Sequence, residues 1–330
     1  MSVSVFAPAS IGNVNVGFDV LGLAVKPVDG TYLGDVISVD QAEQNQLIVT
    51  GAFASKLPKD SKQNIVWGCL LLFNRHLAQA GHQAAPVAIT LDKKMPVGSG
   101  LGSSACSVVG ALKALNEFYR QYHDVSFDQQ TLLRMMGEME AQISGSIHYD
   151  NVAPCFLGGL QLMVPDDNVI ARALPMFEDC FFVMAYPGIN VSTKAAREVL
   201  PDAYSKSDVI AFGQNLATFV DACHRQDKQQ AFTVLKDVIA EPYRQNLLPG
   251  FRQACDYLTG EQCLAVGISG SGPTLFCVTD NKEKAEQYAA WLTDNYLVSD
   301  TEGNGEGFVH ICKADTAGAV LIDNSAQQKN

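Results

Sequence analysis

The sequence lacks the features typical of a membrane protein, a nucleic-acid-binding protein or a disulfide-bonded protein. No stretch comes near the roughly eighteen uninterrupted apolar residues that a membrane span requires. Lys and Arg number 23 against 35 Asp and Glu, so the net charge of −12 repels a nucleic-acid backbone. The nine cysteines form no CxxC pair. They are therefore expected to be reduced, mostly buried thiols of a cytoplasmic protein, neither a disulfide framework nor a zinc site.

Export signals, internal repeats and low-complexity tracts are also missing. The first residues, "MSVSVFAPAS", contain no basic segment and no long apolar segment, so we expect no export. A chain of 330 residues is long for one core and ordinary for two. We therefore expect two domains with a functional site between them.

Hydrophobic patterns predict strands and helices mixed along the whole chain. We expect strands at 2–8, 85–91, 180–188 and 308–313, a turn and strand over 152–164, and two β-rich runs within 263–280. Helices are expected after the glycine-rich loop near residue 100, at 129–146, from Ser192 or Thr193 to before Pro201, and at 207–224, 227–240 and 282–296. This mixture predicts an α+β protein. "PDDN" at 165–168 suggests a boundary between domains 1–165 and 166–330.

The glycine-rich stretch "MPVGSGLGSSACSVVGAL" combines a flexible loop with the start of a helix. It lacks the terminal lysine of a GxxxxGK[ST] loop, and Ser103 stands where a GxGxxG loop has its third glycine. Gly98, Gly100 and Gly102 let a ligand approach the backbone amides, and the first N–H groups of the helix favour an anion. The stretch predicts a phosphate site, in which the hydroxyls of Ser103 and Ser104 could bind phosphate, and either of them could bind a metal ion. A flexible turn with a serine cap is the alternative.

Glu140 falls inside the apolar stripe of the helix predicted at 129–146. A carboxylate on the buried side of a helix needs a strong partner, and Mg²⁺ bound to nucleotide phosphates is one. A glutamate at the stripe edge that reaches solvent is the alternative.

A cluster of polar residues, "HYDN" at 148–151, lies between a helix end and the next strand. His148 and Asp150 suggest a serine-hydrolase triad, but no serine has glycine at both −2 and +2, so that class is excluded. A functional loop and a structural turn satisfied by its own Asp150 and Asn151 both remain possible.

Further polar residues interrupt the apolar segment "APASIGNVNVGFDVLGLAV", where Asn13, Asn15 and Asp19 must be paired by backbone or ligand. Arg197 and Arg244 are candidates for binding a carboxylate, because a guanidinium can do so through two hydrogen bonds.

Three segments in order resemble the GHMP kinases, a family named for galactokinase, homoserine kinase, mevalonate kinase and phosphomevalonate kinase. They are "APASIGNVNVGFDVLGLAV", "PVGSGLGSSACSVVGAL" and "GISGSGPTLF", and the resemblance spans nearly the whole chain. "GFDVLG", "GSIHYDNVAPCFLGG", "AYPGINVSTKAAR", "IAEPYR" and "GFVHICKADTAGA" are most similar to the bacterial branch of the family that phosphorylates L-homoserine.

The resemblance implies a first domain like domain 2 of ribosomal protein S5, a ferredoxin-like second domain and MgATP in the cleft between them. It implies transfer of the γ-phosphate of ATP to the side-chain hydroxyl of L-homoserine in threonine biosynthesis. The expected ATP-binding residues are Pro96, Val97, Gly98, Ser99, Gly100, Leu101, Gly102, Ser103, Ser104, Ala105 and Cys106. The expected acceptor-binding residues are Asn13, Asp19, His148, Asp150, Thr193, Arg197 and Arg244. Glu140 and Ser104 are the expected metal ligands.

Catalysis is expected from Glu140, Asn151 and His148, without a side-chain base. Some relatives use an Asp as the base eleven residues beyond the metal-binding Glu, and Asn151 stands at that place here. We expect Asn151 to position the hydroxyl, while His148 acts as the base in the alternative version. A kinase for another alcohol and a non-catalytic ATP-binding protein are the competing functions, and the oligomeric state is left open, with a homodimer as one option.

Overall fold

Two β-sheets organise the chain. The computed structural model describes residues 2–166, 168–297 and 307–322. One sheet has five strands in the order β13-β1-β4-β6-β5. The other has eight, in the order β10-β11-β9-β12-β3-β7-β8, with β2 paired to β3. The strands are β1 (Ser2–Pro8), β2 (Ser10–Gly12), β3 (Leu21–Pro27), β4 (Gly34–Gln41), β5 (Gln46–Thr50), β6 (Val87–Asp92), β7 (Leu160–Met163), β8 (Ala171–Leu174), β9 (Phe181–Tyr186), β10 (Ala265–Ile268), β11 (Leu275–Thr279), β12 (Phe308–Ala314) and β13 (Val320–Ile322).

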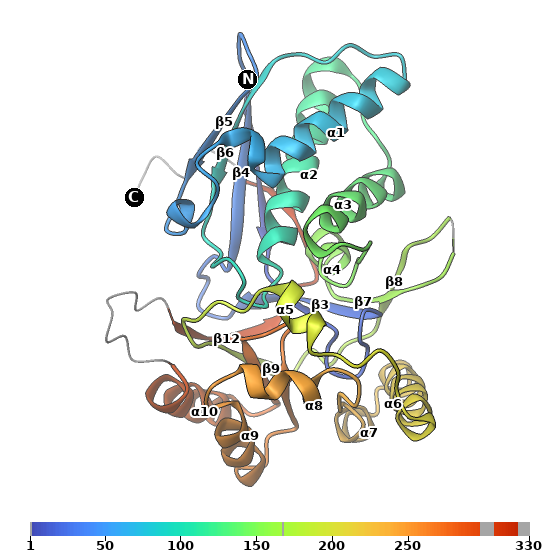
Figure 1. Cartoon of the computed structure of the whole chain (residues 1–330), viewed down its shortest axis with the longest axis vertical. Helices are drawn as coiled ribbons and strands as arrows, with labels where there is room; N and C mark the ends of the chain where they lie inside the picture. Colours follow the sequence, from blue (N-terminus) through green and yellow to red (C-terminus); the bar gives the residue numbers. More distant parts are fainter. Residues whose placement is uncertain (1, 167, 298–306, 323–330) are drawn as a thin grey trace.

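The helices form a layer on each side of the eight-stranded sheet. They are α1 (Ile65–Gln79), α2 (Ser103–His123), α3 (Gln129–Ser144), α4 (Val152–Leu157), α5 (Thr193–Glu198), α6 (Lys206–Arg225), α7 (Lys228–Thr233), α8 (Glu241–Arg244), α9 (Phe251–Gly260) and α10 (Lys282–Asn295). Short 3₁₀ turns occur at Ala54–Lys56, Ser61–Gln63 and Gln245–Leu247. Figure 1 shows α1 to α4 with the five-stranded sheet above the eight-stranded sheet, and α6 to α10 below it.

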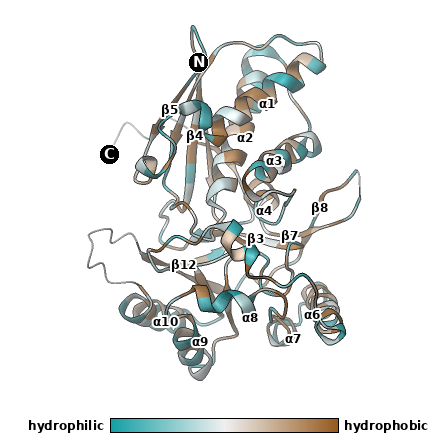
Figure 2. Ribbon diagram, viewed as in Figure 1, coloured by the Kyte–Doolittle hydropathy of each residue, from teal (hydrophilic) through white to brown (hydrophobic). Residues whose placement is uncertain are grey.

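The core lies between the helices and the sheets. Phe73 of α1 contacts Tyr119 of α2 in the buried layer behind the five-stranded sheet. A second cluster of buried side chains packs α9 and α10 against β9, β10 and β11. Figure 2 shows these lower helices with mixed hydrophilic and hydrophobic colouring, as expected for helices with one buried face.

Most predicted elements are confirmed, including the strands at β1, β6, β9 and β12 and the helices α2, α3, α5, α6 and α10. Two predictions were wrong. Residues 152–157 form helix α4 and not a turn, because Pro154 lies in the first turn, where its missing N–H is tolerated. The helix predicted at 227–240 ends at Thr233. Beyond it, the Asp237 carboxylate accepts the backbone N–H groups of residues 239, 240 and 241, which caps a new turn.

The α+β class and the two-domain organisation are confirmed, while both sheets draw on distant parts of the chain. β3 and β7 belong to the sheet that contains β9 to β12, and β13 pairs with β1. Residues 164–170 connect the paired strands β7 and β8. The division into 1–165 and 166–330 stays a prediction. Each sheet contains strands from both sides of that division.

Across the described part of the chain, no helix is both long and apolar enough to cross a membrane.

Candidate active site

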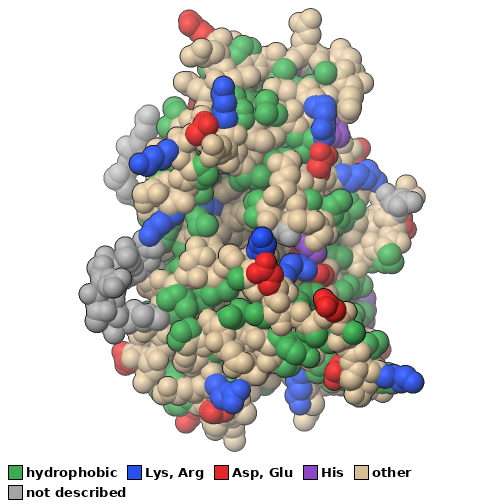
Figure 3. Space-filling model, viewed as in Figure 1, with side chains coloured by type: hydrophobic (Ala, Val, Ile, Leu, Met, Phe, Trp, Pro, Cys, Tyr) green, Lys and Arg blue, Asp and Glu red, His purple; other side chains and the backbone are tan. Residues whose placement is uncertain are grey.

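A cavity of about 490 Å³ opens where the glycine-rich loop meets the eight-stranded sheet. The start of α1, the glycine-rich loop and the start of α2 form one part of its wall. The end of α3, the 148–151 turn, α5 and the turn at Gly270 form the rest. Figure 3 shows charged side chains of both signs in the middle of this face, where α5 lies in Figure 1. The wall of this cavity therefore draws on both halves of the chain.

The glycine-rich loop needs its glycines, because its backbone is left-handed and closely packed. Gly98, Gly100 and Gly102 have φ of 69°, 78° and 69°. A Cβ on Gly100 would lie 2.5 Å from the carbonyl oxygen of Ser269, and one on Gly98 would lie 2.1 Å from Oδ1 of Asn190. The loop is therefore held closely against segments from the second half of the chain.

A buried ion pair lies beneath the loop. Lys93 Nζ is 2.6 Å from Asp35 Oδ2 and also donates to the carbonyl of Ser103 and the hydroxyl of Ser107. Asp35 in addition accepts the backbone N–H groups of Lys94 and Met95. The network joins β4, β6 and the first turn of α2, so it fixes the direction in which that helix points at the cavity.

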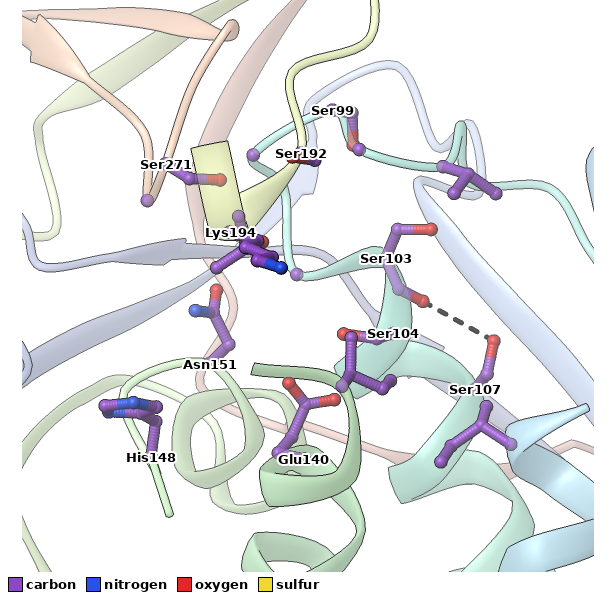
Figure 4. Close-up of a pocket in the computed structure, with 18 of the residues that line it drawn as sticks. Ser99, Ser103, Ser104, Ser107, Glu140, His148, Asn151, Ser192, Lys194 and Ser271 are labelled. Atoms are coloured by element: carbon purple, nitrogen blue, oxygen red, sulfur yellow. Dashed lines mark hydrogen bonds between the residues drawn. The ribbon is translucent and has the colours of Figure 1, made fainter. Parts of the chain in front are cut away.

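Glu140 and Ser104 meet on the wall of the cavity. Figure 4 shows Glu140 of α3 pointing toward the start of α2, where Ser104 lies. Burial raises the pKa of the Glu140 carboxyl above its usual range, while a hydrogen bond from Ser104 and the charge of Lys93 partly oppose that shift. Burial makes the ionised carboxylate unfavourable, and a bound cation would offset that cost. A carboxylate beside a hydroxyl is a pair of oxygen ligands suited to a hard divalent cation.

The 148–151 turn packs against the first motif, which is the segment "APASIGNVNVGFDVLGLAV" at residues 7–25. A Cβ on Gly22 would lie 1.8 Å from the carbonyl oxygen of Asp150, so only glycine fits there. Asn151 accepts a hydrogen bond from the Ser10 hydroxyl and donates one to Asp150 Oδ2. His148 Nε2 is 2.6 Å from the Ser146 hydroxyl. Burial lowers the pKa of His148, and the charge of Asp19 partly opposes that shift, so the neutral imidazole is favoured.

Asp150 is buried, and its pKa is raised to about 7. Burial is the main cause, the charge of Asp19 adds to it, and Arg197 opposes it. Near neutral pH this carboxyl therefore exchanges between its neutral and ionised forms.

The first motif forms a strained turn at the other end of the cavity. Asn13, Val14 and Asn15 have φ of 68°, 44° and 54°, an unusual conformation for a β-branched residue such as Val14. Asn13 accepts the N–H of Asp19 and donates to the carbonyl of Gly270. Asn15 is paired by backbone: it donates to the carbonyls of Leu235 and Val266, which connects the turn to the second half of the chain.

The two arginines reach the same end of the cavity. Arg197 Nη2 is 2.7 Å from Asp19 Oδ1 and 3.4 Å from His148 Nδ1. Arg244 is buried and donates to the carbonyls of Ala196 and Gly270. Two guanidinium groups, two carboxylates and one imidazole therefore surround one small volume.

The structure gathers most predicted site residues around the cavity. Those that line it are Asn13, Asp19, Val97, Gly98, Ser99, Gly100, Gly102, Ser103, Ser104, Glu140, His148, Asp150, Asn151, Thr193, Arg197 and Arg244. The side chains of Leu101, Ala105 and Cys106 point into the core beneath the loop. Pro96 lines a smaller neighbouring cavity with Phe53 and Tyr186.

Helix α5 was expected to be capped by Ser192 or Thr193, and the structure shows that Ser192 is the cap.

Sequence reasoning missed several lining residues. Leu57, Pro58, Asn64 and Ile65 line it near the start of α1, and Asn190, Lys194 and Ser271 line it from the second half of the chain. Asn190 and Lys194 lie inside the segment "AYPGINVSTKAAR", and Ser271 lies inside "GISGSGPTLF", but nothing in those segments singled these residues out. Near the start of α1, the N-cap position of Asn64 before an apolar helix was the available signal.

Comparison with known proteins identifies the family of the chain. Residues 64–159 match the model of the GHMP kinase N-terminal domain, and residues 219–296 match the GHMP kinase C-terminal model. A solved homoserine kinase from Cytophaga hutchinsonii is 32% identical and superposes with a TM-score of 0.84 over 97% of each chain. The chain belongs to the GHMP kinase family.

More distant solved structures share the fold. A putative homoserine kinase from Listeria monocytogenes is 20% identical, with a TM-score of 0.68 over 98% of this chain and all of the other. A mevalonate kinase from L. major, solved with R-mevalonate, is 13% identical, with a TM-score of 0.67 over 94% of this chain and 96% of the other. The GHMP kinase fold is thus present from one end of the described chain to the other.

Proposed function

We propose that this GHMP kinase transfers the γ-phosphate of ATP to the side-chain hydroxyl of L-homoserine, giving O-phospho-L-homoserine for threonine biosynthesis. One observation carries the proposal. The end of the cavity remote from the start of α1 presents both arginines and both carboxylates, which is the charge pattern that a zwitterionic amino acid requires. The similarity to the Cytophaga enzyme supports the same acceptor.

The opposite end of the cavity suits the base of ATP. Leu57, Pro58 and Ile65 offer an apolar surface, and the buried Asn64 Nδ2 has no hydrogen-bond partner among the described residues. A purine ring can take this place, with a ring nitrogen accepting from Asn64. The triphosphate would then lie along the loop amides and the first turn of α2, where the helix dipole favours negative charge.

Glu140 and Ser104 would hold Mg²⁺ beside the phosphates. When bound, Mg²⁺ neutralises charge on the phosphate oxygens. The chain itself must align the acceptor hydroxyl with the γ-phosphate and exclude water from the path.

The acceptor would enter by exchanging ion pairs. In the free protein Arg197 is bonded to Asp19. An amino acid could insert its ammonium beside Asp19 and Asp150 and its carboxylate beside Arg197 and Arg244, so that each charge keeps an opposite partner. Its side-chain hydroxyl would then point toward Asn151. Asn151 lies close to the glycine-rich loop, because a Cβ on Gly102 would be 3.0 Å from Asn151 Oδ1.

His148 lies farther from the loop than Asn151 (Figure 4), and its Nδ1 faces Asp19 and Arg197. This arrangement supports a mechanism without a side-chain base. Asn151 would orient the side-chain hydroxyl of the acceptor, and the proton of that hydroxyl would pass to phosphate or to water.

Replacing His148 with alanine should therefore lower kcat about tenfold or less, with a larger effect on the KM for L-homoserine, because His148 supports Asp19 and Arg197. Steady-state kinetics of His148→Ala and Asn151→Asp test this prediction. A loss of about 10³-fold in kcat for His148→Ala, with kcat unchanged in Asn151→Asp, would establish His148 as the base.

The pH profile should reveal Asp150. Its carboxyl is protonated below about pH 7 in the free protein, and the neutral form attracts an ammonium poorly. We expect kcat/KM for L-homoserine to fall as the pH drops through about 7 and to level off above it. Asp150→Asn should lower kcat/KM and abolish the inflection. The same inflection in the variant would assign it to another group.

A coupled assay of ADP release with MgATP tests the proposed acceptor. We expect L-homoserine to be preferred over L-threonine, mevalonate and galactose, since mevalonate and galactose have no ammonium for Asp19 and Asp150. Faster release with mevalonate or galactose would indicate a kinase for another alcohol. ATP binding without acceptor-dependent release would indicate a non-catalytic ATP-binding protein.

A further inference from the structure

The ring of Phe18 lies next to both arginines at the acceptor end of the cavity. The guanidinium carbon of Arg197 is 5.7 Å from the ring centroid, and that of Arg244 is 5.3 Å from it. Both distances lie within the range of a cation–π contact. One aromatic ring therefore contacts two cations that come from two different helices, α5 and α8.

These cations repel each other, and Arg244 is also buried. Burial lowers the pKa of Arg244 and the charge of Arg197 lowers it further, whereas Asp237 and two other carboxylates raise it. The negative face of an aromatic ring stabilises a nearby guanidinium without neutralising it. A further carboxylate in place of the ring would instead compete with the substrate for the arginines. Phe18 can thus hold two cations in place while leaving them charged toward a ligand.

The turn that carries Phe18 is fixed on both sides of the ring. The N–H of Gly17 donates to the carbonyl of Asn13, and the N–H of Asp19 donates to the Asn13 side chain, at 2.9 Å each. Asn13 and Arg244 also share one acceptor, the carbonyl oxygen of Gly270. The ring and the buried arginine are therefore positioned by a common set of hydrogen bonds.

Each arginine retains donors for a ligand. Arg197 uses Nη2 for Asp19 and His148, and its buried Nε has no partner among the described residues. Arg244 uses Nε and Nη1 for backbone carbonyls. The direction of the remaining donors depends on how the two guanidinium planes are held, and Phe18 contacts both.

We propose that Phe18 is a positioning residue that presents Arg197 and Arg244 together to the carboxylate of the acceptor amino acid. This inference rests on the proposed function and extends it to specificity. Loss of the ring should weaken binding of acceptors that have a carboxylate and leave those without one almost unaffected.

The first experiment compares Phe18→Leu with Phe18→Tyr on two acceptors, L-homoserine and L-homoserine amide, in which an uncharged amide replaces the carboxylate. For Phe18→Leu we expect the KM for L-homoserine to rise about tenfold or more, which corresponds to the loss of one to two cation–π contacts. The KM for the amide and for ATP should change less than about threefold. Phe18→Tyr should behave as the wild type does. Equal losses for the acid and the amide would overturn the proposal.

A second experiment separates ring electrostatics from packing and does not depend on phosphoryl transfer. Phenylalanine with one, two or three ring fluorines at position 18 keeps its shape but weakens its attraction for cations. Calorimetry would measure the Kd for L-2-aminobutyrate, which has the ammonium and carboxylate but no hydroxyl. We expect Kd to rise with each added fluorine, even if L-homoserine proves not to be the acceptor. A constant Kd across the series, or no binding by the wild type, would contradict the proposal.

Discussion

Replacing Glu140 with glutamine is expected to lower kcat by about 10³-fold, equivalent to about 4 kcal/mol of transition-state stabilisation, and to raise the Mg²⁺ concentration needed for half-maximal rate. The carboxylate lies at the cavity wall beside Ser104, and burial penalises its ionised form. A divalent cation offsets that penalty, and the neutral amide loses this attraction while keeping the size of the side chain.

Glu138→Gln is the matched control on the same helix. Glu138 points away from the cavity and forms an ion pair with Arg75 of α1, with both side chains about half exposed. It should change kcat and the Mg²⁺ requirement less than twofold, since exposed ion pairs contribute little. Initial rates measured across a Mg²⁺ titration for both variants provide the comparison. An unchanged Mg²⁺ requirement in Glu140→Gln would remove Glu140 from the metal site.

Replacing Lys93 with methionine is expected to lower the free energy of unfolding by about 3–5 kcal/mol, because it leaves the buried Asp35 carboxylate without its cation. The variant should also lose ATP affinity, since Lys93 holds the first turn of α2 through Ser103 and Ser107. Chemical denaturation measures the first effect, and nucleotide titration measures the second.

Lys94→Met is the control for this prediction. Lys94 is the next residue along the chain, but its side chain is partly exposed and lies 3.4 Å from Asp92, so its loss should cost less than about 1 kcal/mol. Adding Asp35→Asn to Lys93→Met should recover part of the stability by removing the uncompensated charge. Equal destabilisation by Lys93→Met and Lys94→Met would show that the buried pair contributes nothing special.

Local sequence was sufficient to predict the elements whose causes are local. The glycines of the loop, the serines at the start of α2 and the apolar stripe of α3 are short-range patterns, and the structure has the loop and both helices at those places. Glu140 was singled out because a charged residue interrupts that stripe. The structure places it on the cavity wall.

The rest depends on contacts between distant segments. Arg197 and Asp19 are 178 residues apart, and Lys93 and Asp35 are 58 apart, so no periodicity reveals either pair. Lys93 stands next to the glycine-rich loop in the sequence, but only the fold shows that its side chain is bonded to Asp35, Ser103 and Ser107. The helix predicted at 227–240 stops early, and Asp237 then caps a separate turn through three backbone hydrogen bonds that the sequence pattern did not reveal. Phe18 looked like an ordinary apolar residue until both arginines were placed around it.

The most direct test of the central claim is the identity of the product. The purified protein would be incubated with MgATP and L-homoserine, and the products followed by ³¹P NMR and mass spectrometry. The proposed function predicts one O-phospho-L-homoserine for each ADP formed, with the phosphate on the side-chain oxygen. ADP accompanied only by inorganic phosphate, or no turnover of homoserine by a protein that phosphorylates another alcohol, would contradict it.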